Sequence, residues 1–199
     1  STEFGVYYNG LAGFNANATL FHNEFEDKIA SGNPVADPLC AGNAGGTCSQ
    51  LVNIDEAVTR GLELAASWEF MPAWTLSGNY TYTDSEQKSG ADKGQPLTNT
   101  PEHLANAKLD WQTTNRLNLW LRGEYRGERA RFSSSYANLA NGNGSYSSNQ
   151  SLYDALGSKT KAYTLFHLGG SFQATDNLTL NASIYNLFCL LYTSPSPRD

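Results

Sequence analysis

The side chains that could perform catalysis are scattered along this 199-residue sequence. The three histidines, His22, His103 and His167, occur in separate predicted strands, and no nucleophile pattern lies near any of them. The glycine-rich run at residues 42–46 precedes no helical pattern, which argues against a phosphate-binding loop. We therefore expect no enzymatic activity, no resident cofactor and no metal site.

Arginines form the most informative charge cluster of the chain. Arg122, Arg126, Arg129 and Arg131 are interleaved with Glu124 and Glu128. On a continued strand Arg122 and Arg126 would share the polar face, whereas Arg129 and Arg131 would face outward unless a bulge resets the register. Arginine suits anion binding because its charge is permanent and its planar head stacks on aromatic rings such as Tyr136. The alternative is that these arginines pair with the neighbouring glutamates, or meet lipid phosphate where they face outward.

The elements that carry these residues are predicted to be β-strands, because apolar and polar side chains alternate over most of the chain. We expect eight strands, at residues 2–8, 14–28, 60–70, 74–83, 101–112, 117–126, 163–174 and 178–188. In residues 60–83, which predict a hairpin, one face is apolar with aromatic ends and the other is polar. Phe21 and Phe25 fall on a polar face, which a bulge or a strand end rising above a membrane would explain.

The predicted connections alternate in length. Short turns at 9–13, 71–73, 113–116 and 175–177 alternate with long loops at 29–50, 84–100 and 132–159, so all long loops lie at one end of the sheet. Outer-membrane barrels are built in this way. A mean hydropathy of −0.46 excludes a transmembrane helix, and a net charge of −6 argues against nucleic acid as a partner.

Aromatic residues support an all-β fold, an antiparallel transmembrane β-barrel, because they gather at two levels of the apolar face. Two such levels are the belts expected at lipid–water interfaces. The aromatic residues beside the short turns are Trp68, Phe70, Trp74, Trp111 and Phe172, and those toward the long loops are Tyr80, Tyr82 and Tyr125. A soluble β-barrel carrier is the alternative, but its outer face would carry Lys and Glu, whereas this polar face is mainly Thr, Ser, Asn and Gln.

Several stretches of the chain together resemble TonB-dependent outer-membrane receptors of the ferric-siderophore type. They are FHNEFEDKI at 21–29, NIDEA at 53–57 running into RGLE at 60–63, PEHLAN at 101–106 and YNLF at 185–188. The set is most similar to receptors for ferric enterobactin and related catecholates. The resemblance implies a barrel of twenty-two strands plugged by an N-terminal domain. Residues 1–188 would then be a fragment of about eight strands near the end, without the plug and the last strand.

The resemblance also implies a function, a location and partners. The intact protein would be a monomer in the bacterial outer membrane, in contact with lipid and lipopolysaccharide. It would bind a ferric siderophore at its outer mouth, with Arg126, Arg129, Arg131 and Tyr136 as candidate ligand-binding residues, and iron would enter only within that ligand. TonB would drive import through the missing N-terminal region. The alternatives are a passive porin or a barrel anchor; a barrel protease or phospholipase has no supporting residues.

Two further predictions concern the cysteines and the C-terminus. Cys40 and Cys48 lie in one predicted loop and are expected to form a disulfide, since the cell surface permits such bonds; a metal site and two free thiols are the alternatives. Residues 189–199 resemble the translation of a sequencing-adapter read-through, contain two prolines and cannot form a central strand. We expect this tail to be foreign and unstructured; a genuine flexible C-terminus is the alternative.

Overall fold

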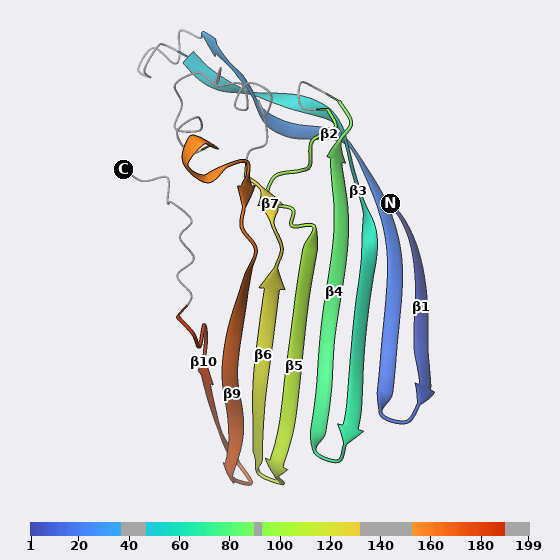
Figure 1. Cartoon of the computed structure of the whole chain (residues 1–199), viewed down its shortest axis with the longest axis vertical. Helices are drawn as coiled ribbons and strands as arrows, with labels where there is room; N and C mark the ends of the chain where they lie inside the picture. Colours follow the sequence, from blue (N-terminus) through green and yellow to red (C-terminus); the bar gives the residue numbers. More distant parts are fainter. Residues whose placement is uncertain (37–46, 90–92, 132–152, 190–199) are drawn as a thin grey trace.

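The computed structural model describes residues 1–36, 47–89, 93–131 and 153–189. Eight strands form one antiparallel sheet in the order β1-β2-β3-β4-β5-β6-β9-β10 (Figure 1). They are β1 (Thr2–Leu11), β2 (Phe14–Ala36), β3 (Thr47–Met71), β4 (Trp74–Gln87), β5 (His103–Thr114), β6 (Leu117–Arg126), β9 (Tyr163–Thr175) and β10 (Leu178–Ile184). Between β6 and β9, β7 (Arg129–Ala130) and β8 (Lys159–Thr160) pair as a small separate ribbon. The prediction of eight antiparallel strands is confirmed.

The sheet is a single layer, which explains its exposed apolar surface. Among the described residues the only buried hydrophobic side chains are Ala57 and Ala130. Strands β1 and β10 are the two edges of the sheet. Their side chains are largely exposed, for example Phe4 at 66% and Leu180 at 55%. No helix among the described residues is long and apolar enough to cross a bilayer.

The strand register brings like side chains into continuous rows across the sheet. On one face, here called the apolar face, Phe14, Trp68, Leu76, Leu109, Leu121 and Leu168 lie opposite one another in successive strands. On the other, the polar face, the corresponding row is Asn15, Ser67, Ser77, Lys108, Arg122 and His167. The predicted two-faced hairpin of residues 60–83 is therefore part of a two-faced sheet.

Short and long connections lie at opposite ends of the sheet (Figure 1). The turns between β1 and β2, β3 and β4, β5 and β6, and β9 and β10 lie at what we call the turn end. Strands β2, β4 and β6 end, and strands β3, β5 and β9 begin, at the opposite end of the sheet, which we call the loop end. This confirms the segregation predicted from the lengths of the connections.

The region predicted as a loop at residues 29–50 is largely a hairpin. Strand β2 runs to Ala36 and β3 starts at Thr47, with Ala36 opposite Thr47 and one register shift between Ser31 and Pro34. Figure 1 shows this extension bending across the loop end. In a two-stranded ribbon the backbone groups pair with each other, and no apolar face is needed. The Gly-, Pro- and Asn-rich composition of residues 29–50 therefore gave no sign of these strands.

Three other local predictions need correction. Pairing of β2 with β3 continues without a shift past Phe21, so of the two explanations offered for the aromatics on the polar face the bulge is wrong. Strand β10 ends at Ile184 rather than Phe188, because Asn186 adopts a φ of 53° and the Leu187 N–H donates to the carbonyl of Phe166. Residues 153–156, predicted as loop, form a helical turn.

Candidate functional site

Aromatic side chains of the apolar face pack against one another at the turn end. The rings of Trp74 and Trp111 stack with centroids 4.9 Å apart and planes 9° apart. The ring centroid of Phe70 lies 5.6 Å from that of Trp68 and 6.4 Å from that of Trp74. Phe172, on the same face of β9, is 46% exposed. The cross-strand register thus joins rings from several strands into one level.

A second aromatic level lies closer to the loop end and includes a histidine that the sequence did not indicate. The hydroxyl of Tyr80 and Nδ1 of His103 are 2.8 Å apart. The ring of His103 also lies 5.4 Å from that of Tyr82, which it opposes across β4 and β5. Tyr125 opposes Ala105 on the same face and is 38% exposed. Only the pairing of β4 with β5 brings His103 to this level.

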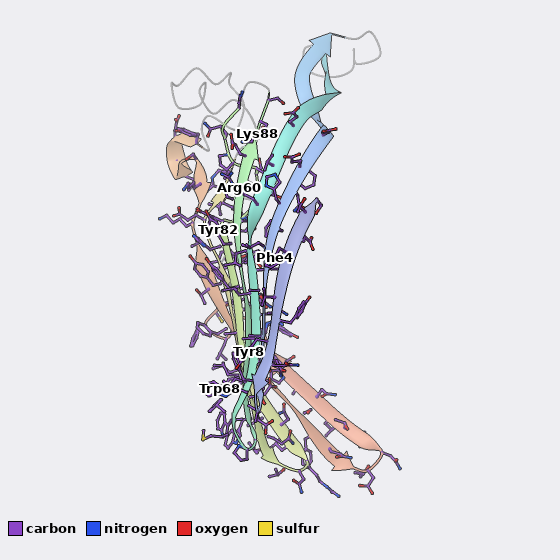
Figure 2. All side chains as sticks on the ribbon, turned by 90° about the vertical axis from the view of Figure 1, so that its right-hand side faces the viewer. Phe4, Tyr8, Arg60, Trp68, Tyr82 and Lys88 are labelled. Atoms are coloured by element: carbon purple, nitrogen blue, oxygen red, sulfur yellow. The ribbon has the colours of Figure 1, made fainter. Side chains whose placement is uncertain are left out.

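Beyond the second aromatic level, the apolar face becomes charged (Figure 2). Arg60 and Asp84 oppose each other, with 2.8 Å between Nη2 and Oδ2. The side-chain hydrogen bond and charge of Asp84 raise the pKa of Arg60. Lys88 pairs with Glu86 farther along β4. The apolar part of this face is thus bounded by Trp68 at one end and by Arg60 at the other.

A scan of β3 tests whether the apolar face lies in lipid. Nitroxide labels on cysteines placed one at a time at residues 62–69 of the complete barrel in lipid are expected to alternate with period two. Labels at Leu62, Leu64, Ala66 and Trp68 should collide mainly with oxygen, which concentrates in hydrocarbon. Labels at the residues between them, which lie on the polar face, should not collide mainly with oxygen. Thr75 and Leu76 in β4 are matched controls, and an absence of alternation would contradict the assignment.

At the loop end, residues 93–102 are held against the end of β4. The Gln87 N–H donates to the Gln95 carbonyl over 2.9 Å, and the Gly94 N–H donates back to Gln87 over 2.8 Å. The Thr83 N–H donates to the carbonyl of Glu102 over 2.9 Å. The side chain of Gln87 is 5% exposed and so lies inside this junction. The connection is therefore ordered where it meets the strand.

The β7–β8 ribbon packs against the same connection and completes a platform, here called the mouth platform. Thr98 forms a parallel bridge with Ala130, and the Asn99 N–H donates to the Ala130 carbonyl over 3.3 Å. The Arg131 N–H donates to the carbonyl of Ser158, and its Nη2 donates to the carbonyl of Lys159 over 3.1 Å. The mouth platform thus combines residues 93–102, β7, β8 and Arg131.

The predicted arginines divide between this platform and the sheet. Arg126 is exposed on the polar face, opposite Leu104 and Tyr163, as predicted from strand alternation. Arg129 and Arg131 belong to the mouth platform. Their outward orientation was predicted only for a strand that continues past Arg126. The chain leaves the β6 ladder there, so alternation no longer assigns a face to these two residues.

Two polar atoms of the mouth platform, Nε of Arg131 and Oγ1 of Thr98, are buried and have no hydrogen-bond partner among the residues that the structure describes. A buried polar group without a partner is unfavourable, so these atoms favour a polar ligand or water near them. Tyr136, the remaining candidate, lies outside the described residues, as does Cys40. Cys48 lies in β3 opposite Val35, and its disulfide with Cys40 stays a prediction.

Deeper on the polar face, the structure brings together two cations and a histidine that lie far apart in the sequence. Lys108 opposes Arg122, and Arg122 opposes His167. His167 is 5% exposed, and its Nδ1 accepts the N–H of Asn186 over 3.1 Å. Neither Lys108 nor His167 stood out in the sequence, since their meeting depends on pairing between strands.

The chain matches one protein family and several of its members. The profile of the TonB-dependent receptor-like β-barrel family matches residues 1–187. An iron-regulated outer membrane virulence protein of Vibrio cholerae is 38% identical over 188 residues, which cover 94% of this chain and 26% of that protein. A ferric enterobactin receptor of Pseudomonas aeruginosa is 30% identical, covering 94% and 24%. This chain thus spans about a quarter of the length of these curated relatives.

Solved structures give the same result for the fold. A variant of the Pseudomonas aeruginosa ferric enterobactin receptor in complex with enterobactin has a TM-score of 0.66 at 26% identity, covering 94% of this chain and 25% of that one. The siderophore receptor PirA of Acinetobacter baumannii has a TM-score of 0.67 at 21% identity, covering 94% and 27%. Residues 188–199 lie beyond the family match, so the foreign origin of the tail stays a prediction. The chain belongs to the TonB-dependent receptors of the bacterial outer membrane, and its eight-stranded sheet is a section of their β-barrel.

Proposed function

We propose that the complete receptor binds a ferric siderophore at the loop end and imports it, with energy supplied through TonB to a region outside this chain. Family membership supports this proposal, as does the description of relatives as iron-regulated or ferric enterobactin receptors. Membership also favours a gated receptor over the passive porin or barrel anchor. Transport changes no bond of the ligand, so the receptor needs no catalytic group.

The siderophore is proposed to be a catecholate. A tris-catecholate complex of Fe(III) keeps three negative charges, because six phenolate charges surround a trivalent cation. Its flat aromatic rings suit guanidinium groups, which pair with anions and stack on rings. Arg126 on the polar face and Arg129 and Arg131 in the mouth platform supply such groups at the loop end. This concentration of arginine at the loop end is the observation that carries the proposal.

Rescue of iron-limited growth tests the proposal. A strain without its own siderophore receptors receives the full-length gene and is then offered ferric complexes of a catecholate, a hydroxamate or haem. We expect rescue by the catecholate alone, and none in an otherwise identical strain without TonB. Rescue by the hydroxamate or haem but not by the catecholate would refute the ligand class. Equal rescue without TonB would refute energised import and favour a passive channel.

A further inference from the structure

A row of basic side chains crosses the polar face at Lys108, Arg122 and His167, in the adjacent strands β5, β6 and β9. Like charges placed directly opposite each other on a sheet repel. The two cations Lys108 and Arg122 therefore require nearby carboxylates, which strands β5 and β6 themselves supply. Asp110 Oδ1 lies 2.7 Å from Nζ of Lys108, Glu124 pairs with Arg122, and Glu124 Oε1 lies 3.4 Å from Nε2 of His167.

The cations of these pairs are more exposed than the carboxylates. The side chains of Lys108 and Arg122 are 41% and 44% exposed, whereas those of Asp110 and Glu124 are 24% and 23% exposed. The carboxylates thus balance the charge from within the wall while the basic groups face the space in front of it. An anion approaching the polar face would therefore meet the two cations first.

These cations border a hollow in the polar face. It measures about 420 Å³ and owes its depth to the short side chains of Ala65 and Ser77, with Asn79 and Asn106 beside them. The amide of Asn106 donates to Asn79 over 3.0 Å. Trp120, also on the polar face, adds an aromatic surface 5.8 Å from Nζ of Lys108. The hollow thus combines cations, amides and a ring, which are groups that a charged aromatic chelate can contact.

The hollow continues the basic groups of the mouth into the barrel. Arg126 lies four residues from Arg122 on the same face of β6. At about 3.4 Å per residue, this separation is about 14 Å along the strand. A ligand released from Arg126 toward the turn end would reach Arg122 and Lys108 next.

We propose that this hollow, the Lys108–Arg122 hollow, is a transit subsite at which the inner barrel wall receives the anionic ferric chelate after it leaves the mouth. The inference rests on the proposed function, since it assumes capture of a ferric catecholate at the loop end. It adds a second binding place for the same class of ligand, on β5 and β6. Lys108 and Arg122 bind the anion, and their ion pairs with Asp110 and Glu124 form again when the ligand leaves.

The test uses the full-length receptor in cells and two double variants. Lys108→Gln with Arg122→Gln removes the cations of the hollow. Arg60→Gln with Lys88→Gln is the matched control, because it also removes one arginine and one lysine, each paired with a carboxylate, from the apolar side of the sheet. Surface binding of radioactive ferric catecholate is measured in de-energised cells, and uptake at saturating ligand in energised cells. Heat modifiability in gels checks that both variants are folded.

The hollow variant is expected to bind the chelate with unchanged Kd and to import it roughly tenfold more slowly, about 1.4 kcal/mol on the transport barrier. The control should match wild type, and Lys108→Arg with Arg122→Lys should restore most of the rate. Unchanged uptake, an equal loss in the control, or entry of a large antibiotic that signals a displaced plug would overturn the subsite. Absence of binding by the wild-type receptor would refute the proposed function, and the subsite with it.

Discussion

Replacing Arg126, Arg129 and Arg131 together by glutamine is expected to raise the Kd of the complete receptor for a ferric catecholate by roughly 100-fold. Each guanidinium facing a multiply charged anion contributes about 1 kcal/mol at a hydrated site, so three contribute about 3 kcal/mol. Equilibrium binding of radioactive chelate to isolated outer membranes measures the change. The single variant Arg126→Gln separates ligand binding from platform structure, because Arg131 also holds the carbonyl of Lys159.

Salt dependence provides an independent readout of the same variant. Ionic strength screens exposed charges over a distance of about 8 Å at physiological salt. Added salt should therefore weaken binding by wild type more steeply than by the triple variant. Replacing Arg60, Lys88 and Arg116 by glutamine removes as much charge from residues outside the mouth platform and should change Kd less than twofold. An equal loss in this control would show that net charge, rather than the mouth, attracts the ligand.

The change Gly61→Ala is expected to prevent assembly of the barrel. A Cβ at residue 61 would overlap the carbonyl oxygen of Tyr82 in β4 and would lie 2.8 Å from Cζ of Phe21 in β2. Since the obstacle on one side is backbone, strands β3 and β4 would have to separate, at a cost of about 3 kcal/mol or more. The measurement is the fraction of receptor in outer membranes that migrates as a folded, heat-modifiable species.

Gly5→Ala in β1 is the matched control. Its added Cβ would come no closer than 3.5 Å to a neighbour, which is an ordinary contact. This variant should assemble at the wild-type level. Truncating Phe21 to alanine in the Gly61→Ala background should not rescue assembly, because the Tyr82 carbonyl remains. Normal assembly of Gly61→Ala would contradict the close approach of β3 and β4.

Phe21 shows the limit of what the alternation of polar and apolar residues along one strand can predict. The sequence placed this aromatic on the polar face and suggested a bulge, or a strand end rising above a membrane, to explain it. In the structure the strand is regular, and Phe21 lies opposite Gly61, whose missing side chain leaves room for the ring. The explanation lies in a residue forty positions away, which becomes a neighbour only through pairing. Alternation assigns faces correctly but does not name cross-strand partners.

The candidate site was less predictable than the sheet for the same reason. Arg126 follows the period of β6, and its face was predicted correctly. Arg129 and Arg131 follow a break in the β6 ladder that no proline marks, so alternation along β6 does not assign their faces. His103 and His167 appeared isolated in the sequence. Each gains its partners, Tyr80 for one and Glu124 for the other, from a different strand.

The extended β2–β3 hairpin shows a further limit of sequence patterns. The alternation of apolar and polar residues that marks the part of each strand near the turn end stops near the second aromatic level, where the apolar face becomes charged. From that level toward the loop end, backbone pairing alone continues the ribbon to Ala36 and Thr47. Patterns of side-chain polarity report where a face is covered by lipid or water, and they do not report where hydrogen-bonded pairing stops.

Uptake of radioactive iron offered as a ferric catecholate tests the central claim most directly. Cells that lack other siderophore receptors and express the full-length protein are compared with and without TonB, at a ligand concentration well above Kd. We predict saturable accumulation that requires both the receptor and TonB, and that slows in the variant lacking Arg126, Arg129 and Arg131 when ligand is scarce. Accumulation that does not saturate or does not require TonB would contradict the account.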